Sequence, residues 1–302
     1  MKKDLLSCMD ITKPDFDRIM SLSAELKAGR GKPGAPKPLE GKSVGMIFAK
    51  SSTRTRVSFE VGIFELGGHP VYLDQSRTQM GRGETVPDTA HVLERYLAGI
   101  VIRTFAQQDL IDLSTNAHIP IINALTDDFH PCQALTDMFT MYEHAGKLEG
   151  LKMAYLGDGA SNMGNSLMLA SQLAGINMVI AAPEEYKPRQ DLMHKNLGSG
   201  KCSWTTSVKE AMDDADFVYT DVWVSMGFEE ESKRRMEILK PYQLNMDVLK
   251  MAKPGVKVLH CLPAHRGDEI TDDVMDSPNS IVFDQAENRL HVQKAIMSLL
   301  IK

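Results

Sequence analysis

The chain has 302 residues, 43% of them hydrophobic and 25% charged, with a formal net charge of −6. The length suits two domains with hydrophobic cores, and the acidic balance argues against nucleic acid as the main partner and favours a small-molecule enzyme. No apolar run approaches the roughly 18 residues that span a membrane, and the N terminus is too short in its apolar part for a signal peptide.

Apolar runs and helix-like segments alternate along the first half of the chain. A helix is predicted from Thr12, and the polar segment 75–85, which has little to bury, is predicted to be a mobile loop. Short turns between alternating strands and helices predict a parallel sheet covered on both faces. The predicted strands are 43–49, 69–74, 99–104 and 120–125, and the predicted helices are 57–66, 88–97, 107–117 and 130–146.

A second unit of the same kind begins near Leu151, and we place the domain boundary near Gly146. Residues 233–235 (Lys-Arg-Arg) follow three glutamates, which predicts a solvated helix face. The fold class predicted is therefore α/β, with two domains that are each a mainly parallel sheet with helices on both faces. The predicted strands are 153–156, 178–181, 203–206, 217–220, 256–260 and 281–283. The predicted helices are 163–174, 208–215 and 286–301, and several charged helices are predicted within 229–250.

The segment Ser51–Arg56 (Ser-Ser-Thr-Arg-Thr-Arg) stands where a predicted strand turns into a helix. A helix N terminus offers free backbone N–H groups and the positive end of the helix dipole, so it favours an anion. Arg54 and Arg56 add guanidinium groups that fit phosphate oxygens. The segment predicts a phosphate site without the P-loop lysine pattern, although a helix cap with two solvated arginines is the simpler alternative.

Other polar residues also follow predicted strands, where ligands bind in open α/β sheets. Each also has a simple structural alternative. Arg103 could be a surface arginine, His130 a turn residue and Gln133 a helix N-terminal residue. Asp221 could be a cap and Cys261 a core thiol. Cations, hydroxyls and an imidazole in the first half suit a phosphate joined to a carbonyl. A carboxylate, an amide, a hydroxyl and a thiol in the second half suit an amino compound. These second-half residues are Asn162, Asp221, Ser225, Cys261 and also His265.

Two features bear on alternative functions and on the compartment. Gly157-x-Gly159 partly resembles a dinucleotide turn, with Glu184 roughly where a ribose-binding acid would stand, but Asn162 occupies the third glycine position. A nicotinamide oxidoreductase is therefore the weaker hypothesis. The four cysteines are far apart with no C-x-x-C pair, which predicts no metal cluster, no disulfide framework and a reducing cytoplasm.

Four motifs in this order resemble the aspartate/ornithine carbamoyltransferase family. They are Ser52–Arg56, His130–Gln133 (His-Pro-Cys-Gln), Asp221–Gly227 (Asp-Val-Trp-Val-Ser-Met-Gly) and His260–Pro263 (His-Cys-Leu-Pro), and Phe283–Arg289 is also similar. The first two are shared across the family. The last ones resemble its ornithine-specific branch, because aspartate-specific members carry an arginine directly after the His-Cys-Leu-Pro position, where this chain has Ala264.

The resemblance implies a role for each matching residue. Arg54, Arg103, His130 and Cys261 would be catalytic, and Gln79 would reach the carbamoyl phosphate of a neighbouring subunit. Pro131 and Cys132 belong to the second motif, Cys132 without a role of its own. The implied carbamoyl phosphate-binding residues are Ser52, Thr53, Arg54, Thr55, Gln79, Arg103, His130, Pro131, Cys132, Gln133, Cys261, Leu262 and Arg289. The implied ornithine-binding residues are Asn162, Asp221, Ser225 and Met226.

The resemblance also implies the reaction and its setting. A first domain, 1–146, would bind carbamoyl phosphate with helix 286–302 packed back on it, and 147–285 would bind ornithine. Attack by the neutral side-chain amine would give citrulline and phosphate in arginine biosynthesis or the urea cycle, with the direction in the cell left open. Because phosphate is already a good leaving group, no metal or cofactor is expected. The implied assembly is a cytoplasmic homotrimer or a multiple of trimers. A catalytically silent homologue is the non-enzyme alternative.

Overall fold

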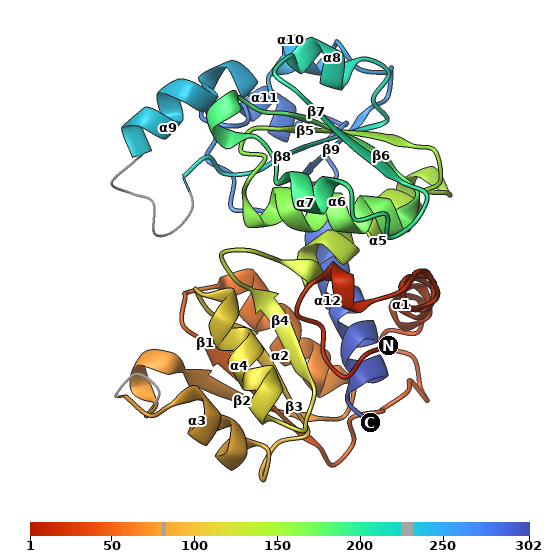
Figure 1. The fold of residues 1–302 in the computed structure, drawn as a ribbon. Helices are drawn as coiled ribbons and strands as arrows, with labels where there is room; N and C mark the ends of the chain where they lie inside the picture. Colours follow the sequence, from red (N-terminus) through yellow and green to blue (C-terminus); the bar gives the residue numbers. More distant parts are fainter. Residues whose placement is uncertain (80–82, 225–231) are drawn as a thin grey trace. The chain divides into compact units, whose positions relative to one another are not determined.

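The computed structural model describes residues 1–79, 83–224 and 232–302, which form two compact units. Unit 1 contains Met1–Phe139 and Glu287–Lys302, and unit 2 contains Thr140–Ala286. Two helices, α5 (Pro131–Ala145) and α12 (Val282–Leu300), contribute residues to both units. Each unit has its own sheet (Figure 1). Within the described residues, no helix is both long enough and apolar enough to cross a membrane.

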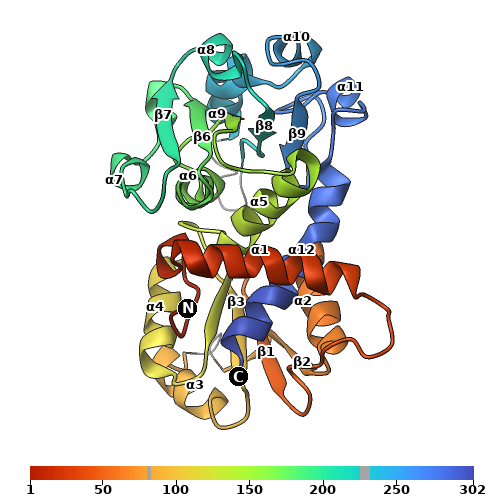
Figure 2. The same ribbon diagram turned by 90° about the vertical axis from the view of Figure 1, so that its right-hand side faces the viewer.

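The sheet of unit 1 has four parallel strands in the order β2-β1-β3-β4. Strands β1, β3 and β4 are almost wholly buried, which explains their continuous apolar sequences. Figure 2 shows α3 and α4 on one side of this sheet and α2 and α12 on the other. The bounds are β1 Ser43–Phe48, β2 His69–Asp74, β3 Gly99–Arg103, β4 Ile121–Leu125, α1 Lys13–Ala28, α2 Thr53–Glu65, α3 Val86–Leu93 and α4 Gln107–Asn116.

The sheet of unit 2 has five parallel strands in the order β7-β6-β5-β8-β9. Figures 1 and 2 show α6 and α7 on one face of this sheet and α8, α10 and α11 on the other. The bounds are β5 Lys152–Leu156, β6 Asn177–Ala181, β7 Lys201–Thr205, β8 Phe217–Thr220, β9 Lys257–His260, α6 Asn162–Ala174, α7 Gln190–Met193, α8 Val208–Met212, α9 Ser232–Leu239, α10 Met246–Leu249 and α11 Asp272–Met275.

The predicted fold class is confirmed, because both units are parallel sheets covered by helices on both faces. The strand predicted at 281–283 is wrong. Pairing beside β9 ends at an isolated bridge between Val258 and Ser280, and the amide of Gln285 then donates to the carbonyl of Ile281 at 3.0 Å in a helical turn. The apolar run Ile-Val-Phe is therefore the start of α12.

One helix prediction needs correction. Helix α2 begins at Thr53, four residues earlier than predicted, because Ser52 caps it and draws the whole motif into its first turns. In the segment 229–250, where charged helices are predicted, α9 ends at Leu239, and Pro241 lies in a short 3-10 turn before α10. The predicted loop 75–85 opens with a 3-10 turn at Gln75–Arg77, and residues 80–82 and 229–231 lie outside the described residues.

Candidate active site

The first set of predicted site residues lies at the switch point of the unit 1 sheet. The chain runs outward from β1 to β2 on one side and from β3 to β4 on the other, so the order reverses between β1 and β3. Ser52 and Thr55 follow β1, and Arg103 ends β3. Ligands of open parallel sheets bind at such a point, outside the carboxyl ends of the strands. The topology therefore brings the predicted phosphate residues together.

Ser52 fixes the N terminus of α2. It has extended backbone angles (φ −161°, ψ 109°), and its hydroxyl accepts a hydrogen bond from the amide of Thr55 at 3.3 Å. The first amides of an α-helix have no carbonyl partner within the helix, so those of Thr53 and Arg54 are directed out of its N terminus. Arg54 is half-buried and Thr53 is exposed. The segment thus offers backbone donors, hydroxyls and a guanidinium in one helical turn, a combination that suits a phosphate.

The hydroxyl of Thr55 joins two guanidinium groups from distant parts of the chain. It accepts from Arg289 Nη2 at 2.9 Å and from Arg103 Nη1 at 3.4 Å, and Arg103 Nη1 also lies 3.4 Å from Ser52 Oγ. Arg289 Nη1 donates to Gln133 Oε1 at 2.7 Å, and Gln133 Nε2 donates to Asp137 Oδ1 at 2.7 Å. These bonds tie α2, β3, α5 and α12 into one positively charged network within unit 1.

His130 is a buried, neutral group beside this network. It is 4% exposed and directly precedes α5. Burial, followed by the charges of Arg289 and Arg103, holds the pKa of the imidazole well below its ordinary value of 6.5. At neutral pH the ring therefore carries one N–H. A neutral imidazole can donate a hydrogen bond to a carbonyl oxygen, which is the function predicted for this residue.

The other predicted carbamoyl phosphate residues of unit 1 lie in different surroundings. Pro131 and Cys132 are buried at the start of α5, where the Cys132 thiol donates to the carbonyl of Asn123 at 3.3 Å. Burial raises the pKa of Cys132 to about 12, so the thiol is unreactive. Gln79 is exposed in the loop after β2, and its backbone carbonyl accepts from the amide of Glu84 at 3.0 Å.

Sequence reasoning missed Lys50, which directly precedes the phosphate segment. Lys50 is 7% exposed, and its ammonium lies 4.2 Å from the centre of the Phe105 ring and pairs with the Asp127 carboxylate at 2.5 Å. A buried lysine is uncommon unless it is paired. Its place at the end of an apolar strand was the signal that could have revealed it.

The predicted site residues of unit 2 also converge at a switch point. The chain proceeds from β5 to β6 and β7 on one side and then returns to β8 and β9 on the other. Asn162 begins α6 in the turn after β5, Asp221 follows β8, and Cys261 follows β9. Asn162 and Asp221 thus flank the point where the order reverses. Ser225 and Met226 lie outside the described residues.

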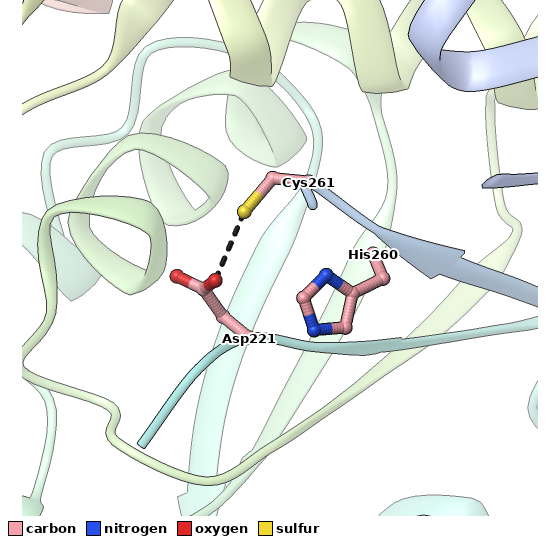
Figure 3. Close-up of side chains that lie close together, drawn as sticks. All are labelled: Asp221, His260 and Cys261. Carbon is pink, nitrogen blue, oxygen red and sulfur yellow. Dashed lines mark hydrogen bonds between the residues drawn. The ribbon is translucent and has the colours of Figure 1, made fainter. Parts of the chain in front are cut away.

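Asp221 and Cys261 are in direct contact, as Figure 3 shows. The Cys261 thiol donates to Asp221 Oδ1 at 2.9 Å, and the same oxygen accepts from the amide of Val222 at 2.8 Å. Asp221 is only 7% exposed, and this burial raises the pKa of its carboxyl above the ordinary value of 3.8. A buried carboxylate of this kind favours a cationic partner, such as an ammonium group.

His260, also drawn in Figure 3, supports the turn that follows β9. Its Nδ1 accepts from the amide of Leu262 at 2.9 Å, and its Nε2 pairs with Glu269 Oε1 at 3.0 Å. Leu262 has a positive φ of 58° and is joined to Pro263 by a cis peptide bond. Asp221, His260 and Cys261 are close enough to hold a metal ion, as are His265, Asp268 and Glu269. However, both ring nitrogens of His260 are already used in hydrogen bonds, so the first group lacks an imidazole ligand.

The predicted solvated face at 233–235 is wrong for Arg235. Lys233 and Arg234 are exposed, but Arg235 is 7% exposed and pairs with the carboxylate of Asp158. Its Nε also donates to the carbonyl of Trp223 at 2.8 Å. The local charge pattern gave no sign of this role, because the acidic partner is 77 residues away in the sequence.

Comparison with known proteins also divides the chain into two parts, each matching one family domain. The family model for the carbamoyl-P binding domain of aspartate/ornithine carbamoyltransferases matches residues 3–143, and the one for their Asp/Orn binding domain matches 149–300. The chain belongs to the aspartate/ornithine carbamoyltransferase family. Ornithine carbamoyltransferase from Geobacter metallireducens is 48% identical over 304 residues and covers 100% of both chains, and that from Thermococcus kodakarensis is 48% identical over 304 residues, covering 99% of this chain and 96% of its own.

Solved structures of this family have the same fold. The ornithine carbamoyltransferase from Pyrococcus furiosus superimposes with a TM-score of 0.94 and 47% identity, covering 99% of this chain and 96% of its own. That from Thermus thermophilus gives a TM-score of 0.91 with 39% identity and covers 100% of both chains. The alternative of a nicotinamide oxidoreductase therefore has no support from the family.

Proposed function

We propose that this protein transfers the carbamoyl group of carbamoyl phosphate to the side-chain amine of L-ornithine, giving L-citrulline and phosphate. The observation that carries the choice of acceptor is the buried carboxylate of Asp221 beside Cys261. This carboxylate suits the α-ammonium group of ornithine, whose side-chain amine is the attacking group. An aspartate acceptor would need extra cations, and Ala264 follows the His-Cys-Leu-Pro segment where an aspartate-specific member has arginine. Relatives that share 48% identity over the whole chain are ornithine carbamoyltransferases.

Unit 1 would bind carbamoyl phosphate. We assign the phosphate to the α2 N terminus, with Ser52, Thr53, Arg54 and Thr55 as its partners. The carbonyl and bridging oxygens are assigned to Arg103, His130 and Gln133, with Arg289 acting through Thr55 and Gln133. The proposed boundary between the two substrate-binding domains stays at residue 146. Gln79 is assigned to the carbamoyl phosphate site of a neighbouring subunit. Cys261 and Leu262 are assigned to the place where the carbamoyl group meets the acceptor.

Unit 2 would bind ornithine through Asn162 and Asp221, with Ser225 and Met226 assigned from the sequence alone. Its neutral side-chain amine attacks the carbamoyl carbon, and a tetrahedral oxyanion forms. The carbon–oxygen bond to phosphate then breaks, and the attacking nitrogen loses a proton. Arg103, Thr55 and the neutral His130 supply donors for the oxygen that gains charge. The rest of the rate enhancement comes from proximity and orientation, because the protein holds the amine nitrogen next to the carbamoyl carbon.

The decisive experiment measures phosphate release from carbamoyl phosphate with ornithine, aspartate, putrescine and acetylornithine in parallel, together with the ureido product. We expect rapid citrulline formation with ornithine alone. A different preferred amine would overturn the assignments of Asn162 and Asp221 but keep the phosphate half. Absence of activity with all four amines would favour a silent homologue.

The attack by a neutral amine has its own test. A free alkyl amine has a pKa of about 10.4, so most ornithine arrives in the unreactive charged form. The rate at subsaturating ornithine should therefore rise steadily with pH from about 6 to 8.5. A flat profile over this range would contradict attack by the neutral amine as the controlling step.

We further propose that the protein acts in the cytoplasm, in arginine metabolism, as a homotrimer or a multiple of trimers. An exposed apolar surface on unit 1 supports self-association. Val57 and Phe64 are 52% and 75% exposed and stand two turns apart on one face of α2. Tyr72, on the edge strand β2 that packs beside α2, is 37% exposed. Large apolar side chains exposed on one face of a helix are a feature of protein–protein interfaces.

A further inference from the structure

Arg235 joins two segments that carry the proposed ornithine-binding residues of unit 2. Its Nε donates to the carbonyl of Trp223 at 2.8 Å, and Trp223 stands two residues after Asp221. Its Nη2 donates to a carboxylate oxygen of Asp158, four residues before Asn162. The side chains of Arg235 and Asp158 are 8% and 10% exposed. One buried guanidinium therefore contacts the turns that follow β8 and β5.

The Asp158 side of this contact leads directly to Asn162. Oδ1 of Asp158 accepts from the amide of Ala160 at 2.9 Å, which shapes the turn after β5. The hydroxyl of Tyr155 lies 3.2 Å from the carbonyl of Asp158 and 3.0 Å from Ser161 Oγ. Ser161 in turn caps α6 by accepting from the amide of Gly164 at 3.0 Å. A movement of Asp158 would thus move the helix end at which Asn162 stands.

The Trp223 side is equally well packed. The indole is 2% exposed, and a β-carbon placed on Gly157 would lie 3.4 Å from its Nε1. Gly157 has a φ of 127°, which only glycine adopts easily, so the chain comes close to the indole here. The guanidinium also lies 4.6 Å from the centre of the Tyr186 ring. Arg235 is held on several sides, and its fork geometry fixes two acceptors at once.

We propose that Arg235 and Asp158 are positioning residues that set the separation of Asn162 and Asp221 and thereby the affinity for the amine acceptor. Neither residue is assigned to touch the substrate. The inference rests on the proposed function, because Asn162 and Asp221 are ornithine-binding residues only there. It adds specificity-determining residues that the sequence motifs do not contain, since Asp158 and Arg235 lie outside all four of them.

The first test compares Arg235→Lys with Arg234→Lys, a matched change at the exposed neighbouring position. Lysine keeps the charge but cannot donate along both directions of the guanidinium fork. In Arg235→Lys we expect kcat/KM for ornithine to fall about 10²-fold, the size of effect that a displacement of about 1 Å can have. The KM for carbamoyl phosphate should stay within about twofold, because unit 1 is untouched. Arg234→Lys should match the wild type.

Two outcomes of these kinetics would overturn the inference. One is an ornithine KM in Arg235→Lys equal to that of Arg234→Lys. The other is an equal rise in the KM of both substrates, which is the result expected of general damage to the fold. A cycle with Asp158→Asn adds a second criterion. If the two residues act through one contact, the double variant should be little worse than the worse single variant, whereas fully additive effects would refute the shared role.

A third test needs no activity. The chain has two tryptophans, so Trp204→Phe leaves Trp223 as the only one. In this background we expect Arg235→Lys to shift the fluorescence emission of Trp223 without substrate, while Arg234→Lys should not. Unchanged emission would show that Arg235 does not hold this segment. The emission and the activity can also disagree. If the emission shifts but ornithine does not increase phosphate release by the wild type, the proposed function is wrong. The claim that Arg235 sets the affinity for ornithine is then wrong as well, although Arg235 still holds this segment.

Discussion

Replacing Asp221 by asparagine should make the protein more stable and less active. The carboxyl is 7% exposed, and its Oδ1 already accepts from Cys261 Sγ and the Val222 amide. Asparagine has the same shape and can keep both of these hydrogen bonds through its carbonyl oxygen. The substitution therefore removes one buried charge and very little else, so its two effects can be separated.

The stability gain follows from the pKa of the Asp221 carboxyl, which burial raises above 3.8. A raised pKa means that the folded state favours the neutral form, so ionisation of Asp221 costs folding free energy as the pH rises through the folded-state pKa. We expect Asp221→Asn to add roughly 1 kcal/mol at neutral pH, a usual size for one stabilising substitution, or about 2–4 °C in Tm. The gain should be larger at neutral pH than at about pH 3, below the ordinary pKa of the carboxyl, where Asp221 is protonated in the folded and the unfolded chain.

The loss of activity follows from the proposed ammonium partner. A hydrogen bond to a charged group contributes about 1.5–3 kcal/mol, so kcat/KM for ornithine should fall roughly 10- to 100-fold, while the KM for carbamoyl phosphate is unchanged. Citrulline formation and thermal unfolding on the same preparations measure both effects. Asp247→Asn is the control, because the side chain of Asp247 is 87% exposed and its loss should change neither.

Two results would refute this reasoning. If Asp221→Asn were less stable than the wild type at pH 8, the buried carboxylate would not be the strained group that its surroundings indicate. If its stability gain were the same at about pH 3 and at neutral pH, the gain would not come from removing an ionisable group. A variant that is more stable and fully active would leave the electrostatic argument intact but remove Asp221 from the ornithine site.

Three further predictions concern unit 1. Thr55→Val removes the hydroxyl shared by Arg103 and Arg289 and should destabilise the protein by about 1–3 kcal/mol, as measured by denaturant unfolding; an unchanged midpoint would show that the two guanidiniums do not depend on it. Because the folded-state pKa of His130 lies below 6.5, its contribution to stability is full above about pH 6.5 and is lost as the pH falls below it; His130→Gln should remove that part of the pH dependence of unfolding. Phe64→Glu should shift the proposed homotrimer to smaller species in sedimentation, with Asp247→Asn, an exposed change in unit 2, as the control.

Much of the site could be predicted from the sequence because its residues stand directly after strands. A buried parallel strand is visible as a continuous apolar run, and its end is marked by the first polar residues. That logic placed Ser52, Arg103, Asn162 and Asp221 at carboxyl ends of strands, where the structure has them. It could not give the strand order, so it could not show that these particular strands flank the two switch points.

The sequence predictions failed where the local residue pattern and the tertiary contacts favour different structures. The run Ile281-Val-Phe has the composition of a strand, yet it opens α12, because short apolar runs do not distinguish the two structures. Arg235 has a neighbourhood typical of solvated helix, yet its partner Asp158 lies far away in the chain. In the same way, nothing local to Thr55 indicated that its hydroxyl would accept from Arg289, 234 residues later.

Arg103 and Arg289 at the unit 1 site and Asp221 at the unit 2 site carry opposite charges, which matches the two substrates proposed for the two units. In unit 1, the guanidiniums of Arg103 and Arg289 share an uncharged acceptor, Thr55, and burial together with their charges lowers the pKa of His130, so the surroundings favour an added anion. In unit 2, the carboxyl of Asp221 is buried with a thiol and an amide as its donors, so the surroundings favour an added cation. Holding the carboxylate of Asp221 away from water costs folding free energy. Such electrostatic strain is expected where a substrate of opposite charge completes the site, and it argues for binding rather than for a purely structural use of these residues.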